Sequence, residues 1–405
     1  MNIRSITYFV HPHAPIQMGG LDLAAVFIAE ARPAFEKAGY PVQTARLATV
    51  PFPELLPPEQ INRLPDLAQS LEGEAKSRGY DYLALGAALP NHLESYQAIP
   101  QAIASTQNVF FSGIMANPGM GVSLPAVRAC AQVIHRAAGL ESSGFANLRF
   151  AALANVPPGA PFFPAAYHQG NTPAFALATE SADLAVRAFA EAASLDDARQ
   201  RLKGDLERHG RMLASVSRYL SRRFKIQFGG IDFSLAPFPE EARSLGFAME
   251  RLGAPGVGRH GSLAAASILA EALDRAKYPR TGFSGLMIPV LEDTTLAARA
   301  AEGLLTVKDL LLYAAVCGTG LDTVPLPGDT APEQIAAILL DLAALSERLK
   351  KPLTARLMPI PGKKAGDRTD FDFAYFANSR VMAVEAVPAQ GFLSGSESFS
   401  LYQRG

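Results

Sequence analysis

Tryptophan is absent from this chain of 405 residues, and only two cysteines occur, Cys130 and Cys317. Nothing in this cysteine usage suggests the oxidising environment of an exported protein. No stretch approaches the roughly 20 apolar residues that span a bilayer. The first residues also lack the apolar core and the small-residue cleavage site of a signal peptide. We therefore expect a cytoplasmic protein with no membrane partner.

An excess of charge of one sign is also missing. The chain carries 37 basic and 38 acidic residues, which give a formal net charge of −1. The densest basic spot outside the predicted helices is the pair Lys363 and Lys364. A nucleic-acid-binding protein usually carries a basic arm or stripe, so we expect no nucleic-acid partner. Apolar residues make up 49% of the chain, which is enough to fill a large interior.

Short apolar segments alternate with helical patterns, which predicts parallel strands connected by helices. Strands that face one interior are expected near residues 6–10, 82–85, 109–114, 285–291 and 353–358. Further strands are expected at residues 42–48, 150–155, 226–235 and 380–385. No linker and no repeat of 20 to 50 residues divides the chain. We therefore expect one α/β barrel-like domain over residues 1–405, with a doubly wound open sheet as the alternative.

Two motifs are explained by helix ends. Residues 256–261 match the GxGxxG pattern, but a predicted helix precedes them and no acidic residue follows at the distance that a dinucleotide site requires. A connection between two helices explains these glycines, and no cofactor can be named. Asp293 or Thr294 is the expected N-cap of a helix over residues 294–303.

Cys317 lies at the end of another predicted helix. Thr306 and Asp309 have the spacing of a capping box, which predicts a helix over residues 307–317 with Gly318 as its C-cap. The negative end of the helix dipole opposes formation of a thiolate there. Cys317 is therefore a candidate nucleophile only if a cation lies nearby, and otherwise a buried, inert thiol.

His11 and His13 flank Pro12 at the end of the first predicted strand. Residues i and i+2 share one face of a strand, so both imidazoles could bind one metal ion. His168 is a possible third ligand from a distant part of the chain. Because two histidines do not define a site, a solvent-exposed loop pair is the alternative.

Residues 318–329, with the sequence GTGLDTVPLPGD, are predicted to be a stiff, turn-rich segment. Gly318 and Gly320 allow close approach of the backbone on both sides of Thr319. Asp322 is a lone carboxylate inside an apolar run. The combination predicts a place where main-chain N–H groups and a charged side chain meet a ligand.

Arg356 lies within the short apolar strand predicted at residues 353–358. A guanidinium removed from water must find an anion or reach solvent. We expect Arg356, supported by Asp322, Thr319 and Lys363, to line a polar pocket at one mouth of the barrel and to bind a carboxylate or phosphate. The alternative is an Arg356–Asp322 ion pair that only closes the barrel.

Residues 318–330 resemble a signature segment of the domain of unknown function 711 family, also called uncharacterised protein family 0210. Residues 228–234 and 351–356 support the resemblance, and the order of predicted elements fits along most of the chain. The resemblance implies a fold like that of pyruvate formate-lyase, with about ten strands in two half-barrels and helices outside. It implies no established reaction.

Glycyl radical enzymes of that fold carry an Arg-Val-x-Gly-Tyr type segment near the C-terminus. This chain reads Val387-Pro388-Ala389-Gln390-Gly391, with no Arg-Val pair before Gly391. We therefore expect no radical chemistry, because a shared fold does not carry a reaction with it.

The expected function is that of an enzyme acting on a small anionic metabolite inside the barrel. A non-catalytic protein that binds or senses such a metabolite is the alternative, and either could form a homo-oligomer. The candidates for moving a proton or attacking a substrate are Cys317, Asp322, His168 and Asp232. The sequence does not name the substrate.

Overall fold

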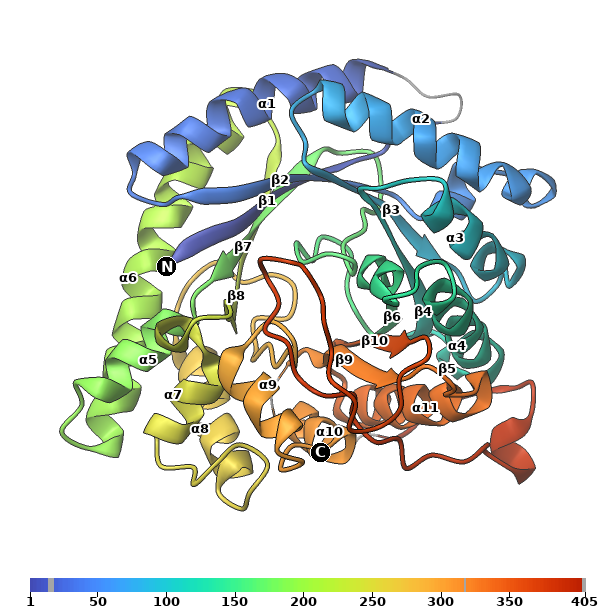
Figure 1. The fold of residues 1–405 in the computed structure, drawn as a ribbon. Coiled ribbons are helices and arrows are strands. Elements are labelled where there is room, and N and C mark those ends of the chain that lie inside the picture. The colour runs from blue at the N-terminus through green and yellow to red at the C-terminus, as the bar shows by residue number, and fades with distance from the viewer. Residues whose placement is uncertain (14–17, 317, 403–405) are drawn as a thin grey trace.

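The computed structural model describes residues 1–13, 18–316 and 318–402. Within these residues, eleven strands form one sheet with helices around it, so the chain is a mixed α/β protein (Figure 1). The strands are β1 (Asn2–Val10), β2 (Val42–Thr49), β3 (Tyr82–Ala88), β4 (Val109–Asn117), β5 (Gly121–Ser123), β6 (Phe150–Ala154), β7 (Ala174–Glu180), β8 (Gln227–Ala236), β9 (Gly320–Pro327), β10 (Leu353–Ile360) and β11 (Ser398–Phe399). The α-helices are α1 (Met18–Lys37), α2 (Leu64–Ser77), α3 (Glu94–Ala104), α4 (Leu124–Ala138), α5 (Ala182–Ala190), α6 (Leu195–Phe224), α7 (Leu245–Arg251), α8 (Ser262–Arg275), α9 (Thr294–Ala301), α10 (Val307–Val316) and α11 (Pro332–Leu349).

The strands follow the order β8-β7-β1-β2-β3-β4-β6-β10-β9, and the short β5 and β11 extend from β4. Neighbouring strands are parallel from β1 to β6, as the alternation of strands and helices predicts. The pairs β1–β7 and β6–β10 are antiparallel, so the sheet changes direction twice. The outer pairs β7–β8 and β9–β10 are again parallel.

Both faces of the sheet are covered, which explains why its strands read as continuous apolar runs. On the outer face, Tyr8 of β1 packs against Phe27 of α1, with 5.4 Å between ring centroids. On the inner face, Phe9 packs with Ala48 of β2 and Ala84 of β3. Figure 1 shows the helices on the outside of a strongly curved sheet. In this view the C-terminal segment, drawn in red, passes across the space that the strands surround. On the inner face, the charged side chains Arg46, Glu292, Asp322 and Arg356 are buried.

A segment of irregular backbone connects the two end strands. The main-chain N–H of Met287 donates to the carbonyl oxygen of Ser234 in β8 (2.8 Å), and that of Val290 donates to the carbonyl oxygen of Asp322 in β9 (3.1 Å). The prediction of a strand at residues 285–291 is wrong, since only an isolated bridge at Pro289 is formed. Pro289 has no main-chain N–H to donate to a neighbouring strand, and Ser284, just before this segment, has a positive φ of 42°. Both features interrupt regular strand pairing.

The interpretation of residues 318–329 as a turn-rich segment is also wrong, because most of them form β9. The prolines are tolerated since β9 lies at the end of the strand order and pairs with β10 on one side. Residues 380–385 do not form the expected strand either. Arg380 makes one isolated bridge with Arg368, and the main-chain N–H of Met382 donates to Pro325.

The other predicted strands are confirmed as β1, β2, β3, β4, β6, β8 and β10. The Ser194 hydroxyl accepts from the main-chain N–H of Asp197 (3.1 Å) and so caps the start of α6. Residues 256–261 connect α7 to α8, and a Cβ at Gly258 would lie 2.0 Å from the carbonyl oxygen of Leu304. Gly258 therefore serves close packing against the loop after α9. No helix in the described ranges has the length and apolar character needed to cross a bilayer.

Asp293 is the N-cap of α9 and stabilises a second helix end at the same time. One carboxylate oxygen accepts from the main-chain N–H groups of Thr295 (2.9 Å) and Leu296 (3.1 Å). The other accepts from the N–H of Gly246 in α7 (3.1 Å), and the Ser244 hydroxyl donates to the first (2.6 Å). Asp293 is fully buried, so without its carboxylate no water molecule could accept the hydrogen bonds of these donors.

Replacing Asp293 with alanine should therefore destabilise the protein more than loss of an ordinary cap. We expect a decrease of about 2–4 kcal/mol in the free energy of unfolding, because two helix ends lose an acceptor in a buried place. Asp309→Ala is the matched control, since it removes only the bonds that the Asp309 carboxylate accepts from the main-chain N–H (2.9 Å) and the hydroxyl (2.6 Å) of Thr306 at the exposed start of α10. Urea denaturation followed by circular dichroism measures both, and equal losses would contradict the shared-cap interpretation.

Candidate functional site

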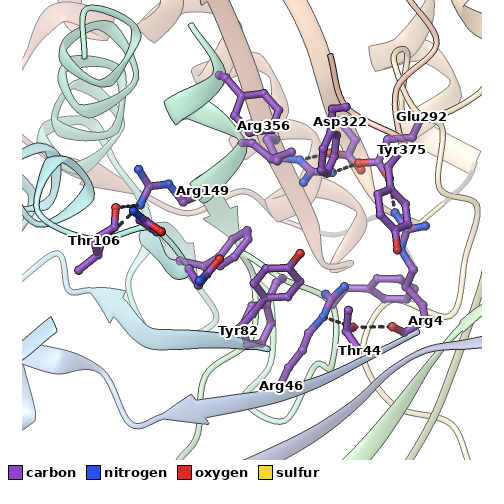
Figure 2. A pocket seen from close by; sticks show the side chains of 18 of the residues that line it. Arg4, Thr44, Arg46, Tyr82, Thr106, Arg149, Glu292, Asp322, Arg356 and Tyr375 are labelled. Carbon is purple, nitrogen blue, oxygen red and sulfur yellow. Dashed lines mark hydrogen bonds and ion pairs between the residues drawn. The ribbon is translucent and has the colours of Figure 1, made fainter. Parts of the chain in front are cut away.

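A cavity of about 480 Å³ opens against the inner face of the sheet. Strands β1, β2, β3, β4, β9 and β10 each contribute lining residues, and so do the loops around residues 104–108, 140–149 and 373–375. Figure 2 shows polar groups on two sides of this space, with Arg356, Asp322 and Glu292 on one side and Arg46 and Tyr82 on the other. Its polar lining is Arg4, Gln43, Thr44, Arg46, Tyr82, Thr106, Gln107, Asn108, Glu141, Arg149, Glu292, Asp322, Arg356 and Tyr375.

Arg356 of β10 is bound by two carboxylates. Its Nε donates to Asp322 Oδ1 (2.6 Å), and its Nη2 donates to Glu292 Oε1 (2.7 Å). Asp322 lies on the neighbouring strand β9, and Glu292 lies in the segment before α9. The ion pair expected between Arg356 and Asp322 is therefore present, and it has a second acid that the sequence did not point to.

The same network extends to the other half of the sheet through Arg4 of β1. Its Nη2 donates to Glu292 Oε2 (2.6 Å), and its Nη1 donates to Glu180 Oε2 of β7 (3.2 Å). Glu180 also pairs with Arg243 and accepts from Gln43 of β2 (2.6 Å). Three arginines and three carboxylates thus neutralise one another across the interior.

Arg46 of β2 is different, because no carboxylate within the described residues pairs with it. It is 8% exposed and lines the cavity. Its Nε donates to Thr44 Oγ1 (3.0 Å), and its guanidinium lies 5.7 Å from the ring centroid of Tyr82 and 5.2 Å from that of Phe163. Burial lowers the pKa of Arg46 to about 10, with the neighbouring Arg4 adding to the effect. The group is still charged at neutral pH.

Arg149, the fourth lining arginine, is occupied at a helix end. Its Nη1 donates to the carbonyl oxygen of Thr106 (2.7 Å), and its Nη2 donates to that of Ile103 (2.9 Å) at the C-terminus of α3. Both carbonyl groups lie at or just after the C-terminus of α3, where a cation suits the helix dipole. Arg149 therefore has a structural role that needs no ligand.

Burial also changes the charge balance of the paired groups. Desolvation raises the pKa of Asp322, and the nearby Glu292 raises it further, although Arg356 works in the opposite direction. Although burial opposes the charge of Arg356, its partners Asp322 and Glu292 raise its pKa. Asp322 is thus the acid in the cavity that accepts a proton more readily than an ordinary aspartate.

The other residues predicted to support Arg356 do not line the cavity. The hydroxyl of Thr319 donates to the carbonyl oxygen of Leu286 (2.7 Å). Gly318 and Gly320 allow close backbone packing, since a Cβ at Gly320 would lie 2.2 Å from the carbonyl oxygen of Thr354. Lys363 donates to the carbonyl oxygen of Arg368 (2.7 Å) and pairs with Asp370 (3.3 Å). Asp322 is therefore the predicted partner that the fold brings to Arg356.

Asp232 of β8 lies outside the cavity lining and is fully buried. Its Oδ2 accepts from the main-chain N–H of Phe283 (2.8 Å), and its Oδ1 accepts from the N–H of Ser284 (2.9 Å) and the hydroxyl of Ser234 (2.5 Å). Burial raises its pKa from 3.8 to about 6, against these hydrogen bonds. Asp232 therefore holds the irregular segment onto β8.

His11 and His13 stack on each other, with 4.4 Å between ring centroids, and the main-chain N–H of His13 donates to His11 Nδ1 (2.9 Å). Burial lowers the pKa of His168 to about 4, and the charge of His11 lowers it further. The described residues hold no group of three or more His, Cys, Asp or Glu side chains that could bind a metal ion. The metal site stays a prediction, and Cys317 lies outside the described residues.

Sequence reasoning missed Arg46, Arg4 and Glu292. Arg46 could have been found from the sequence, because it lies between Ala45 and Leu47 in a predicted strand. Like Arg356, an arginine in such a strand needs an anion or access to solvent. Arg4 was harder to predict. It lies where the register between β1 and β7 shifts, and such an irregularity changes the direction of a side chain in a way that simple alternation does not predict. Nothing local to Glu292 indicated its partners.

The inner-face arginines and their acids lie within residues 1–379, which match the family model described as "Uncharacterised ACR (DUF711)". The chain belongs to this family. A UPF0210 protein of Pyrobaculum islandicum is 32% identical over 404 residues, which cover 93% of this chain and 88% of the relative. Similar proteins occur in Pyrobaculum arsenaticum (33% identical, 88% and 82% covered) and Syntrophotalea carbinolica (31% identical, 88% and 82% covered). The resemblance seen at residues 318–330 is thereby confirmed.

Replacing Asp232 with asparagine should release the segment after residue 280. An amide offers one acceptor where two are needed, so Phe283 or Ser284 loses a bond, and we expect a loss of about 1–3 kcal/mol at pH 7. The native carboxyl binds its proton more tightly than the unfolded one, because its pKa is about 6 rather than 3.8. The wild type should therefore lose stability relative to Asp232→Asn as the pH rises from 4 to 6.

Urea denaturation of both proteins at several pH values measures this difference. Titrations common to the two proteins cancel, so the remaining pH dependence reports residue 232. A wild-type advantage that increases with pH over this window would show that Asp232 is bound as an ordinary ionised carboxylate.

Proposed function

We propose that this protein binds a small metabolite through a carboxylate or phosphate group in the cavity on the inner face of the sheet, with Arg46 as the anchor. The observation that carries the proposal is a buried guanidinium that lines the cavity and lacks a carboxylate partner within the described residues. A charge removed from water is expensive unless an opposite charge is bound. A ligand anion would supply that charge.

The balance of charge around the cavity supports the same proposal. Arg4 and Arg356 are neutralised by Glu180, Glu292 and Asp322, and Arg149 donates to helix carbonyl groups. Arg46 is the cation that remains. The hydroxyl of Tyr82 makes no hydrogen bond to the described residues and points toward the space between Arg46 and Arg356 in Figure 2, so it is a second donor for the same anion.

Arg356 is proposed as a further contact rather than as the anchor. Its Nε and Nη2 are held by Asp322 and Glu292, while its Nη1 makes no hydrogen bond among the described residues. The two N–H bonds of Nη1 are thus left for a ligand. The two carboxylates keep this side of the cavity close to neutral, so Arg356 attracts an anion less than Arg46 does.

We also propose that the sheet closes into a barrel of the pyruvate formate-lyase type, with this cavity in its interior. The hydrogen bonds of residues 279–291 to both β8 and β9 support closure through irregular backbone. Radical chemistry is not part of the proposal. Gly391 lies exposed in a short 3₁₀ turn, whereas the proposed site is built from the strands.

Replacing Arg46 with glutamine should abolish stabilisation by small anions. We expect millimolar acetate, benzoate or inorganic phosphate to raise the melting temperature of the wild type and to leave that of Arg46→Gln unchanged. Without ligand, the variant should melt at or above the wild-type temperature, because the cost of burying an unpaired charge is removed. The effect of acetate or benzoate should be flat between pH 6 and 8.5, since both acids stay ionised there and the pKa of Arg46 is about 10.

The exposed Arg201 on α6 provides a matched control, because Arg201→Gln also removes one positive charge. The control should keep the full ligand effect. If none of these anions stabilises the wild type, or if Arg46→Gln responds as the wild type does, Arg46 is not an anion anchor.

A second candidate function is catalysis on the bound anion. The raised pKa of Asp322 favours it, because such a carboxyl exchanges a proton nearer to neutral pH than an ordinary aspartate does. Asp322→Asn keeps an oxygen that accepts from Arg356 and removes the titrating group. Incubation of wild type and variant with a metabolite extract, followed by mass spectrometry, should show conversion by the wild type alone, while phosphate still stabilises both. Absence of any conversion would favour a binding or sensing protein.

A further inference from the structure

The apolar wall of the cavity is mainly aromatic. Seven of its 23 lining residues carry aromatic rings, whereas aromatic residues make up 8% of the chain. Large aliphatic side chains are few in the same lining, namely Leu140, Leu148 and Met287. The rings are those of Tyr82, Phe110, Phe145, Phe162, Phe163, Phe373 and Tyr375. Binding of an aliphatic chain would not require a wall enriched in aromatic rings.

Three of these rings surround the proposed anchor. The guanidinium of Arg46 lies over the rings of Tyr82 and Phe163. Phe110 packs edge-on against both, with ring centroids 5.3 Å from Tyr82 and 5.4 Å from Phe163. An acid bound to Arg46 therefore places the atoms next to its charged group against aromatic surfaces.

A second aromatic group comes from the C-terminal part of the chain. Phe373 and Phe145 pack edge-on, with centroids 5.1 Å apart, and Tyr375 lies 4.7 Å from the guanidinium carbon of Arg4. The loop that carries Phe373 and Tyr375 is fixed at its base, where Asn378 accepts from the main-chain N–H of Phe371 (2.8 Å) and donates to its carbonyl oxygen (3.1 Å). This aromatic group is therefore held in place before a ligand arrives.

We infer that the ligand is a monoanionic acid whose charged group is attached to an aromatic ring system. The inference rests on the proposed function, because Arg46 must first hold the anionic group. One unpaired cation matches one negative charge, and aromatic walls favour a planar ring, which can stack or pack edge-on against them. A cavity of about 480 Å³ has room for a ring and a short side chain.

Matched pairs of acids test the ring directly. Benzoate and 3-phenylpropionate are compared with cyclohexanecarboxylate and 3-cyclohexylpropionate by isothermal titration calorimetry. Within each pair the charge and the carbon skeleton are the same, and only the planarity and π-system differ. We expect the aromatic member to bind about three- to tenfold more tightly, as for one or two favourable ring contacts.

Phe373→Leu should reduce this preference toward unity while leaving stabilisation by inorganic phosphate intact. Phe392→Leu, at an exposed ring outside the cavity, is the control and should keep the preference. Equal, Arg46-dependent binding of the aromatic and cyclohexyl acids would overturn the aromatic inference and leave the anion site standing. Binding of neutral benzamide as tightly as benzoate would instead overturn the anion site, and no binding of any of these compounds at millimolar concentration would overturn both.

Discussion

Glu292 is the residue on which the interior of this protein depends. Its two oxygens hold Arg356 of β10 and Arg4 of β1, which belong to opposite halves of the strand order. Through Asp322 and Glu180 the same chain of charges reaches β9 and β7. Each buried charge is costly by itself, and it is tolerated here because every neighbour in the chain carries the opposite sign. Loss of Arg356 would leave the buried Asp322 without its ion-pair partner.

The network also explains why polar groups face inward in a protein whose strands are apolar on both faces. The irregular segment that carries Glu292 cannot form a regular ladder, and it is held instead by single bonds to β8 and β9 and by Asp232. Asp293, the next residue, is fixed by two helix ends. The position of Glu292 is therefore determined by packing on both sides of it rather than by a strand.

Much of the fold could be predicted from local patterns, because runs such as residues 109–114 satisfy burial on both faces of a sheet and little else. The strand at residues 285–291 could not, since apolar character suggested pairing while Pro289 removed a donor. In residues 318–329 the opposite happened, and turn-forming residues occupy an end strand that tolerates them. The local residue pattern does not determine whether a segment becomes an end strand or a central strand of the sheet.

The site divides in the same way. The pairing of Arg356 with Asp322 followed from the rule that a buried arginine needs an acid, and the two residues lie on adjacent strands. The register between β9 and β10 shifts at this point, and Thr323 has a positive φ of 43°, so the exact direction of Asp322 depends on a bulge that the sequence pattern does not reveal. Glu292 could not be assigned, because its partners lie 64 and 288 positions away in the sequence.

The cavity lies within the part of the chain that defines the family. Its lining residues run from Arg4 to Tyr375, and the family model ends at residue 379, where the main-chain N–H of Ser379 bonds to Thr369 and closes the base of the aromatic loop. The exposed apolar side chains Phe392 and Tyr402 fall after this point. The features that favour a bound aromatic acid, one unpaired cation and two groups of rings, therefore belong to the matched region, whereas the exposed residues of the C-terminal segment play no part in forming the cavity.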